Sequence, residues 1–174
     1  MSKIVQAASM LPSIREPDKE QSLKQMLTWT GIVLVIYFVL GSIDLYGANA
    51  AAVQQALQQL QTFQTLLGAQ IGSIITLGIG PIVTASIILQ MMVGSDLLPW
   101  NTNTDKGQQK FQAAQKLFAY SLTIIQAIGY VLSGTFGSGL APVTMALLIG
   151  QITMGGWIII LLDDLVQKWG FGSG

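Results

Sequence analysis

The chain contains no cysteine and no histidine, and only 9% of its residues are charged. Without cysteine there is no disulfide framework, no thiol nucleophile and no cysteine-metal site. Without histidine a Ser-His-Asp triad is excluded, and because the eight acidic residues are scattered we expect no metal site. Eight basic residues balance the eight acidic ones, so charge gives no reason to expect nucleic acid.

The small charged fraction also indicates a membrane protein. Soluble domains carry about 25% charged residues, whereas this chain is 51% hydrophobic and has a mean hydropathy of +0.58. The chain opens with a polar stretch and has no apolar run behind a basic start, so no cleavable signal peptide is expected. We therefore expect an all-α, multi-span membrane protein.

Long uncharged runs predict four transmembrane helices, since about 20 apolar residues cross a hydrocarbon core about 30 Å thick. The expected segments are a cytosolic amphipathic segment at 1–24, a first span at 25–46, an outer amphipathic helix at 47–69, a broken second span at 70–95, a cytosolic loop at 96–116, a third span at 117–136, a fourth span at 140–162 and a cytosolic end at 163–174. Pro12 and Pro17 prevent the first segment from forming one long helix. Only small residues join the last two spans, which predicts a tight antiparallel hairpin.

The basic residues predict the orientation, because lysine and arginine concentrate on the cytoplasmic side of a membrane. With these four spans, all basic residues fall on one side: Lys3, Arg15, Lys19, Lys24, Lys106, Lys110, Lys116 and Lys168. We expect a multi-pass protein of the cytoplasmic membrane, with both ends of this segment in the cytosol.

The second apolar run contains a backbone break at Gly78, Gly80 and Pro81. Glycine adopts backbone angles that a helix does not use, and proline has no N–H to donate. Pro81 suits the first turn of a new helix that continues from Ile82. In lipid, irregular backbone is tolerated only inside protein or against a water-filled cavity, so the break predicts a pore or a binding site. The alternative is a proline kink in an ordinary spanning helix.

The stretch at 47–69 combines apolar side chains at helical spacing with uncharged glutamines on its other faces. A neutral amide face can contact water, headgroups or the inside of a cavity. The alternative is a helix that lies on the outer leaflet.

Several residues inside the spans carry their own predictions. Thr84 and Gln126 either face a cavity or other helices, or form local hydrogen bonds. Gly155 and Gly156 allow another helix to approach the fourth span closely. Ile79 and Val83 flank the break and are either plain core or a hydrophobic constriction that seals a channel.

Four stretches carry a resemblance to a known family: TWTGIVLVIYFVLGSIDLYG, ITLGIGPIVTASIILQMMVGS, FQAAQKLFAYSLTIIQAIGYVLSGTFG and LLDDLVQKWGFGSG. In this order and spacing they closely resemble the amino-terminal part of SecY, the large subunit of the protein-conducting translocon, and most of all its archaeal branch. The resemblance runs from about Pro12 to Gly174, and the glutamine-rich helix is its least similar part. The family has ten spans in two related halves, of which this chain carries the first four.

The resemblance implies roles for the matching positions. Residues from about Gln58 to Ala69 resemble the plug that closes the resting pore, with Leu60, Phe63, Leu66 and Leu67 as its apolar side chains. Ile79 and Val83 match two members of the aliphatic pore ring. The lateral gate, through which signal sequences reach lipid, is implied at Thr84, Ile87, Ile88, Met91 and Gln126.

The resemblance also implies partners and a function. The implied partners are SecE-type and Sec-beta-type small membrane subunits, the ribosome or another driving partner, signal sequences and nascent polypeptides, the lipid bilayer, and the remaining six spans of SecY. The implied function is a non-enzymatic channel for secretion and membrane insertion of polypeptides, without cofactors. The alternative is a self-sufficient four-span small-solute transporter or membrane scaffold. An intramembrane enzyme is disfavoured, because Asp163 and Asp164 lie at the end of a span, where solvated residues are usual.

Overall fold

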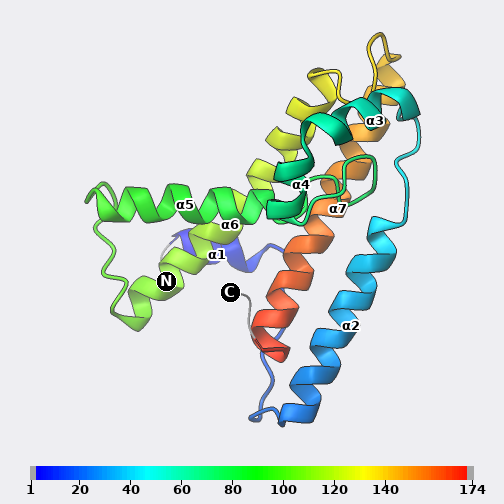
Figure 1. Ribbon diagram of the computed structural model, residues 1–174. Coiled ribbons are helices and arrows are strands. Elements are labelled where there is room, and N and C mark those ends of the chain that lie inside the picture. The colour runs from blue at the N-terminus through cyan, green and yellow to red at the C-terminus, as the bar shows by residue number, and fades with distance from the viewer. Residues whose placement is uncertain (1–2, 172–174) are drawn as a thin grey trace.

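The computed structural model describes residues 3–171, and within this range it is built from α-helices without any strand (Figure 1). The helices are α1 Lys3–Ser9, α2 Leu23–Gly41, α3 Ala50–Gln59, α4 Gln61–Leu67, α5 Gly80–Gly94, α6 Asp105–Leu132 and α7 Pro142–Trp169. The expected all-α architecture is confirmed.

The long helices pack as neighbours in the order α2, α7, α6 and α5, and α1 packs on α6. Figure 1 shows α2 and α7 side by side, with α5 and α6 leading away from them. The short helix α3 lies near the turn that joins α6 to α7, where the Asn49 N–H donates to the carbonyl oxygen of Phe136 over 2.9 Å, and α4 runs from there toward the start of α5 (Figure 1). The predicted hairpin of the last two long helices is confirmed.

Local sequence signals set the helix starts. Ser22 and Gln25 form a reciprocal capping box at the start of α2. The Thr104 hydroxyl accepts the Gly107 N–H at the start of α6, and Pro142 occupies the first turn of α7.

Two helices extend beyond the spans expected from hydropathy. α6 begins at Asp105, inside the expected loop at 96–116, because Thr104 caps it and glutamine, lysine and alanine are good helix formers. α7 continues past residue 162 to Trp169 and so includes both aspartates. Hydropathy marks where a helix is apolar, and these helices continue beyond that region.

Two helices in the described part of the chain, α2 and α7, are long and apolar enough to cross a membrane by length and composition. α5 is apolar but has only 15 residues, or about 22 Å at 1.5 Å per residue, which is shorter than a core of about 30 Å. The crossing expected at 70–95 therefore needs the non-helical residues before α5 as well.

The buried apolar side chains form two clusters. The first joins α3, α6, α7 and the segment before α5, and consists of Leu45, Ala56, Ile71, Leu77, Ala127, Val131, Phe136, Leu148 and Ile152. The second joins α5, α6 and α7, and consists of Ala85, Ala119, Tyr120 and Ile160, with Leu11, Ile82 and Leu122 packed against it.

α2 presents apolar side chains to its surroundings on nearly every face. Leu34, Val35 and Phe38 are 63%, 65% and 80% exposed, and only 6% of the most apolar window of α2 is buried. A helix that is apolar all round needs an apolar environment. Because the rest of the described chain does not supply it, lipid or further protein has to cover α2.

Candidate functional site

The predicted break is a run of turns between α4 and α5, at residues 68–79, which we call the turn segment. Gly68, Gly72 and Gly78 have φ angles of 56°, 94° and 53°, which glycine adopts without strain. A Cβ at Gly78 would collide with the backbone of Leu67 and Ala69. The alternative of a simple proline kink is therefore wrong. α5 begins at Gly80 with Pro81 in its first turn, as predicted.

Hydrogen bonds inside the turn segment pair part of its backbone. The Ser73 N–H donates to Gln70 O over 3.0 Å, and the Gly78 N–H to Ile75 O over 2.9 Å. The hydroxyl of the fully buried Thr76 donates to Ser73 O over 2.6 Å. Irregular backbone is tolerated at membrane depth when protein encloses it and its polar groups are paired. Most residues from 71 to 78 are buried, and these bonds pair several of their polar groups.

The turn segment is also tied to the stretch that follows α2. The Leu45 N–H donates to Gly72 O over 2.8 Å, and the Ile74 N–H donates to Ile43 O over 3.0 Å. These bonds flank a single antiparallel bridge between Asp44 and Ser73. The start of α5 is therefore held in place by residues about thirty positions earlier in the chain.

The paired glycines of α7 allow two close contacts. A Cβ on Gly155 would collide with the carbonyl oxygen of Ile74, and one on Gly156 would lie 2.5 Å from Cγ2 of Thr123 on α6. The predicted close approach is confirmed, although the element that approaches Gly155 is the turn segment and not a helix.

α5 has one packed face and one open face. Pro81, Ala85 and Leu89 recur every fourth residue and are buried. Ile79 at the N-cap, Ile87 and Met91 are 37%, 51% and 68% exposed. Val83 and Ile88 are half-buried, and helical spacing puts Val83 between Ile79 and Ile87. The two candidate ring residues thus share the open face with two of the candidate gate residues.

Thr84 and Gln126 meet at Gly80. The Thr84 hydroxyl donates to Gly80 O over 2.8 Å, which is the local bond considered as its alternative role. A Cβ added at Gly80 would lie 3.6 Å from Oε1 of Gln126 on α6 and 3.5 Å from the side chain of Leu67 on α4. α4 and α6 therefore converge on the start of α5.

The outer segment expected as one helix at 47–69 is two helices, and that expectation is wrong. Leu60 separates α3 from α4 with φ −109° and ψ 16°. α3 packs on the first core cluster through the buried Ala56, while the chain turns at Leu60 so that Leu67 reaches α5. There the Ile79 N–H donates to Leu67 O over 2.9 Å. The residues around Leu60 have no local preference for a turn. We attribute the turn to the tertiary contacts of α3 and Leu67.

α4 contains most of the candidate plug side chains and has no buried residue. Phe63 and Leu66 are 61% and 71% exposed, and Leu60 and Leu67 are half-buried. The position of α3 and α4 relative to a lipid surface stays a prediction.

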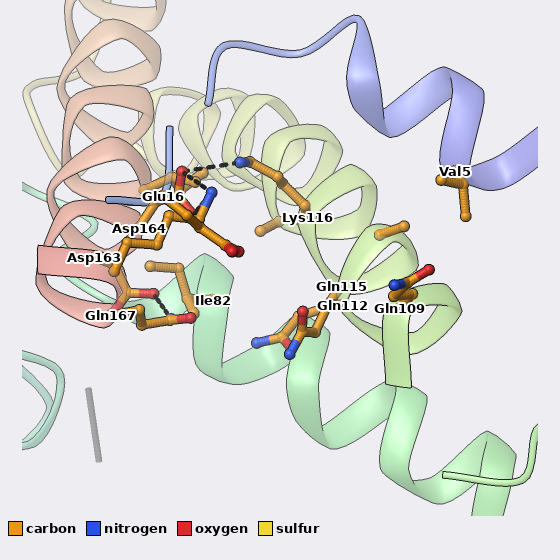
Figure 2. Close-up of a pocket in the computed structure, with 14 residues that line it drawn as sticks. Val5, Glu16, Ile82, Gln109, Gln112, Gln115, Lys116, Asp163, Asp164 and Gln167 are labelled. Atoms are coloured by element: carbon orange, nitrogen blue, oxygen red, sulfur yellow. Dashed lines mark hydrogen bonds and ion pairs between the residues drawn. The ribbon is translucent and has the colours of Figure 1, made fainter. Parts of the chain in front are cut away.

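A cavity of about 280 Å³ lies at the far end of α7, between α1, α5 and α6 (Figure 2). Asp164 lies at this cavity and pairs with Lys116 of α6 and with Lys168 of α7, each over 3.2 Å. Sequence reasoning treated Asp164 as a solvated residue, but its side chain is only 14% exposed. Lys168, four residues further along the helix, was the available signal.

The environment of Asp164 lowers the pKa of its carboxyl, at a position outside the predicted spans. Burial alone raises this pKa, but the N–H of Ile14 and the two lysines outweigh that effect. Asp164 is therefore ionised at neutral pH. Within residues 3–171 no group of three acidic side chains is arranged to hold a metal ion.

An exposed apolar α2, a second long apolar helix α7 and a short apolar α5 behind a mostly buried run of turns point to the class of multi-pass α-helical membrane proteins. A SecY family model matches residues 73–174 of this chain. The chain belongs to the SecY family.

Individual relatives agree with this assignment. The SecY protein translocase subunit of Methanothermobacter thermautotrophicus is 46% identical over 95% of this chain and 35% of its own length. That of Methanocaldococcus jannaschii is 41% identical over 100% of this chain and 39% of its own. The chain thus spans little more than a third of the curated relatives it matches.

Solved structures show the same fold. A protein-conducting channel superimposes with a TM-score of 0.85 at 37% identity, over 99% of this chain and 39% of the other. Sec61 in the canine ribosome-channel complex gives the same TM-score of 0.85, with the same identity and coverage. A SecY structure described for its plug domain gives 0.81 at 38% identity, over 97% of this chain and 37% of the other.

Proposed function

We propose that this chain forms the amino-terminal part of a SecY-type channel that moves polypeptides across, or sideways into, the cytoplasmic membrane. The observation that carries the proposal is the enclosed turn segment that leads into the open apolar face of α5. Such a face suits the wall of a pore that a moving chain slides past, because aliphatic side chains exclude ions without binding the substrate. The solved relatives, which include a protein-conducting channel and Sec61 in a ribosome-channel complex, support the same conclusion.

The site residues take roles that follow from their positions. Ile79 and Val83 contribute to the pore ring from the open face of α5. Thr84, Ile87, Ile88, Met91 and Gln126 contribute one side of the lateral gate. α4, with Leu60, Phe63, Leu66 and Leu67, serves as the plug, because it has no buried residue and its Leu67 lies beside the start of α5.

In this proposal the chain crosses the membrane four times and both of its ends lie in the cytosol. α2, the turn segment with α5, the apolar part of α6, and α7 up to residue 162 are the four crossings. The other half of the channel covers the open face of α5. The ribosome is a partner, an assignment supported by the canine ribosome-channel complex that contains Sec61, together with SecE-type and Sec-beta-type subunits and signal sequences.

The ring assignment is tested by measuring ion conductance of the complete channel complex in planar bilayers. Val83→Asn places a polar amide in the constriction and should raise resting conductance several-fold, because a hydrophobic constriction excludes water and ions. Val143→Asn is the matched control, since Val143 is 71% exposed and lies at the start of α7. Equal conductance of the two variants would remove Val83 from the ring.

A further inference from the structure

Residues 11–15, between α1 and α2, form a non-helical segment that lies across the middle of α6 and the carboxyl end of α7; we call it the strap. Side chains of these two helices hold its main chain. The Tyr120 hydroxyl donates to Pro12 O over 3.2 Å, Lys168 Nζ to Ile14 O over 2.6 Å, and Trp169 Nε1 to Arg15 O over 2.7 Å. These donors replace the partners that a strand or helix would give the backbone of the strap.

Asp164 is the common acceptor of this arrangement. Its Oδ2 accepts the Ile14 N–H over 2.8 Å and a bond from Lys116 over 3.2 Å, while its Oδ1 pairs with Lys168 over 3.2 Å. The side chains of Lys116 and Lys168 are only 17% and 23% exposed. Loss of the carboxylate would leave two shielded ammonium groups without their counter-charge, which is costly. One carboxylate thus joins the strap, α6 and α7.

The strap also reaches the packed face of α5. Leu11 packs against the second core cluster, in which Ala85 of α5 meets Tyr120 and Ile160. Figure 2 shows Ile82 of α5 at the same cavity as Asp164 and Lys116. Leu11 of the strap therefore belongs to the same group of apolar contacts as the packed face of α5.

We propose that Asp164 is a positioning residue for α5: by holding the strap across α6 and α7, it sets the resting position of the helix that carries the gate residues. The inference rests on the proposed function only in calling α5 the gate helix. Asp164 itself does not contact the translocating chain.

The first measurement is hydrogen–deuterium exchange of residues 11–15 in the full-length channel complex. Asp164→Asn should raise this exchange about tenfold or more, because a charge-assisted hydrogen bond and two ion pairs are lost. Asp164→Glu keeps the charge and should restore much of the protection. Asp105→Asn, the same change at the exposed start of α6, should behave as wild type. Unchanged exchange in Asp164→Asn would overturn the role of Asp164 in holding the strap.

The second measurement is the distance between spin labels on α5 and α7, attached to cysteines replacing the exposed residues Gln90 and Met154. Asp164→Asn should shift or broaden the distance distribution, and Asp164→Glu and Asp105→Asn should not. An unchanged distribution alongside faster strap exchange would overturn the positioning of α5, because a purely stabilising ion pair behaves in that way.

A further variant keeps the test decisive if Asp164→Asn fails to fold. Lys168→Gln removes the bond to Ile14 O and leaves the Lys116 pair in place, so it should produce the same two changes to a smaller degree. Neither readout depends on transport. If the unmodified complex moved no polypeptide while both readouts changed as expected, the proposed function would fail and the positioning of α5 would stand.

Discussion

At the scale of single residues, the two adjacent glycines of α7 decide how closely the bundle packs. Gly155→Ala places a methyl group against the carbonyl oxygen of Ile74, so either α7 or the turn segment has to move. We expect a loss of about 2 kcal/mol in unfolding free energy, as overpacked sites show. The measurement is thermal unfolding of the complex in detergent.

The matched control for this change lies on the same helix. A Cβ at Gly150 has no neighbour within 4 Å, so Gly150→Ala should leave stability unchanged or raise it slightly, because alanine favours a helix. Equal effects at the two positions would show that the contact with Ile74 is not tight in solution.

A second prediction at this scale concerns the pH dependence of Asp164. The folded state lowers the pKa of its carboxyl below the ordinary value of 3.8. Its contribution to stability is therefore complete above the unfolded pKa and is lost as pH falls through the folded value. We expect the strap to stay bound at neutral pH and to be released only below pH 3.8.

Trp169 reports this release, because its indole donates to Arg15 O and its ring lies 5.3 Å from that of Trp29. Its fluorescence should change in an acid titration of the wild type, and the change should be absent in Asp164→Asn. A transition of the same size and midpoint in both proteins would assign it to other carboxyl groups.

At the scale of elements, α3 and α4 differ in how firmly they are held. α3 buries Ala56 in the first cluster and packs Val53 against Gly72, whereas α4 has no buried residue. We expect the backbone amides of α4 to exchange with deuterium about tenfold faster than those of α3, since local opening follows burial. Hydrogen–deuterium exchange with mass spectrometry measures both helices in one sample, so α3 is the internal control.

This comparison decides how far a movable plug extends. Faster exchange confined to α4 would place the movable part between Leu60 and Gly68, with α3 as a fixed support. Equal protection of the two helices would contradict a plug that moves independently of α3.

At the scale of the whole molecule, the number and direction of the membrane crossings can be measured directly, because the chain has no cysteine. Single cysteines replacing the exposed residues Ser138 and Thr102 lie on opposite sides of the membrane in the proposed topology. A membrane-impermeant maleimide should label Ser138→Cys in intact cells, and Thr102→Cys only after permeabilisation. Labelling of both in intact cells would rule out the four-span arrangement.

The amino-acid sequence was sufficient to predict the all-helical class, the need for an apolar environment, the position of the break and the family. Each of these depends on local properties, such as the length of an uncharged run, or a glycine and a proline within three positions. For the same reason, the start of α5 near Pro81 could be predicted to within two residues.

The folded structure was needed to find where the turn segment is anchored, that the outer segment bends at Leu60, and that Asp164 joins the strap to α6 and α7. The physical reason is that each depends on contacts between residues far apart in the chain, such as Ile43 with Ile74 and Ile14 with Asp164. Hydropathy treats an aspartate at a helix end as solvated, because it does not register a backbone N–H that arrives from 150 residues away.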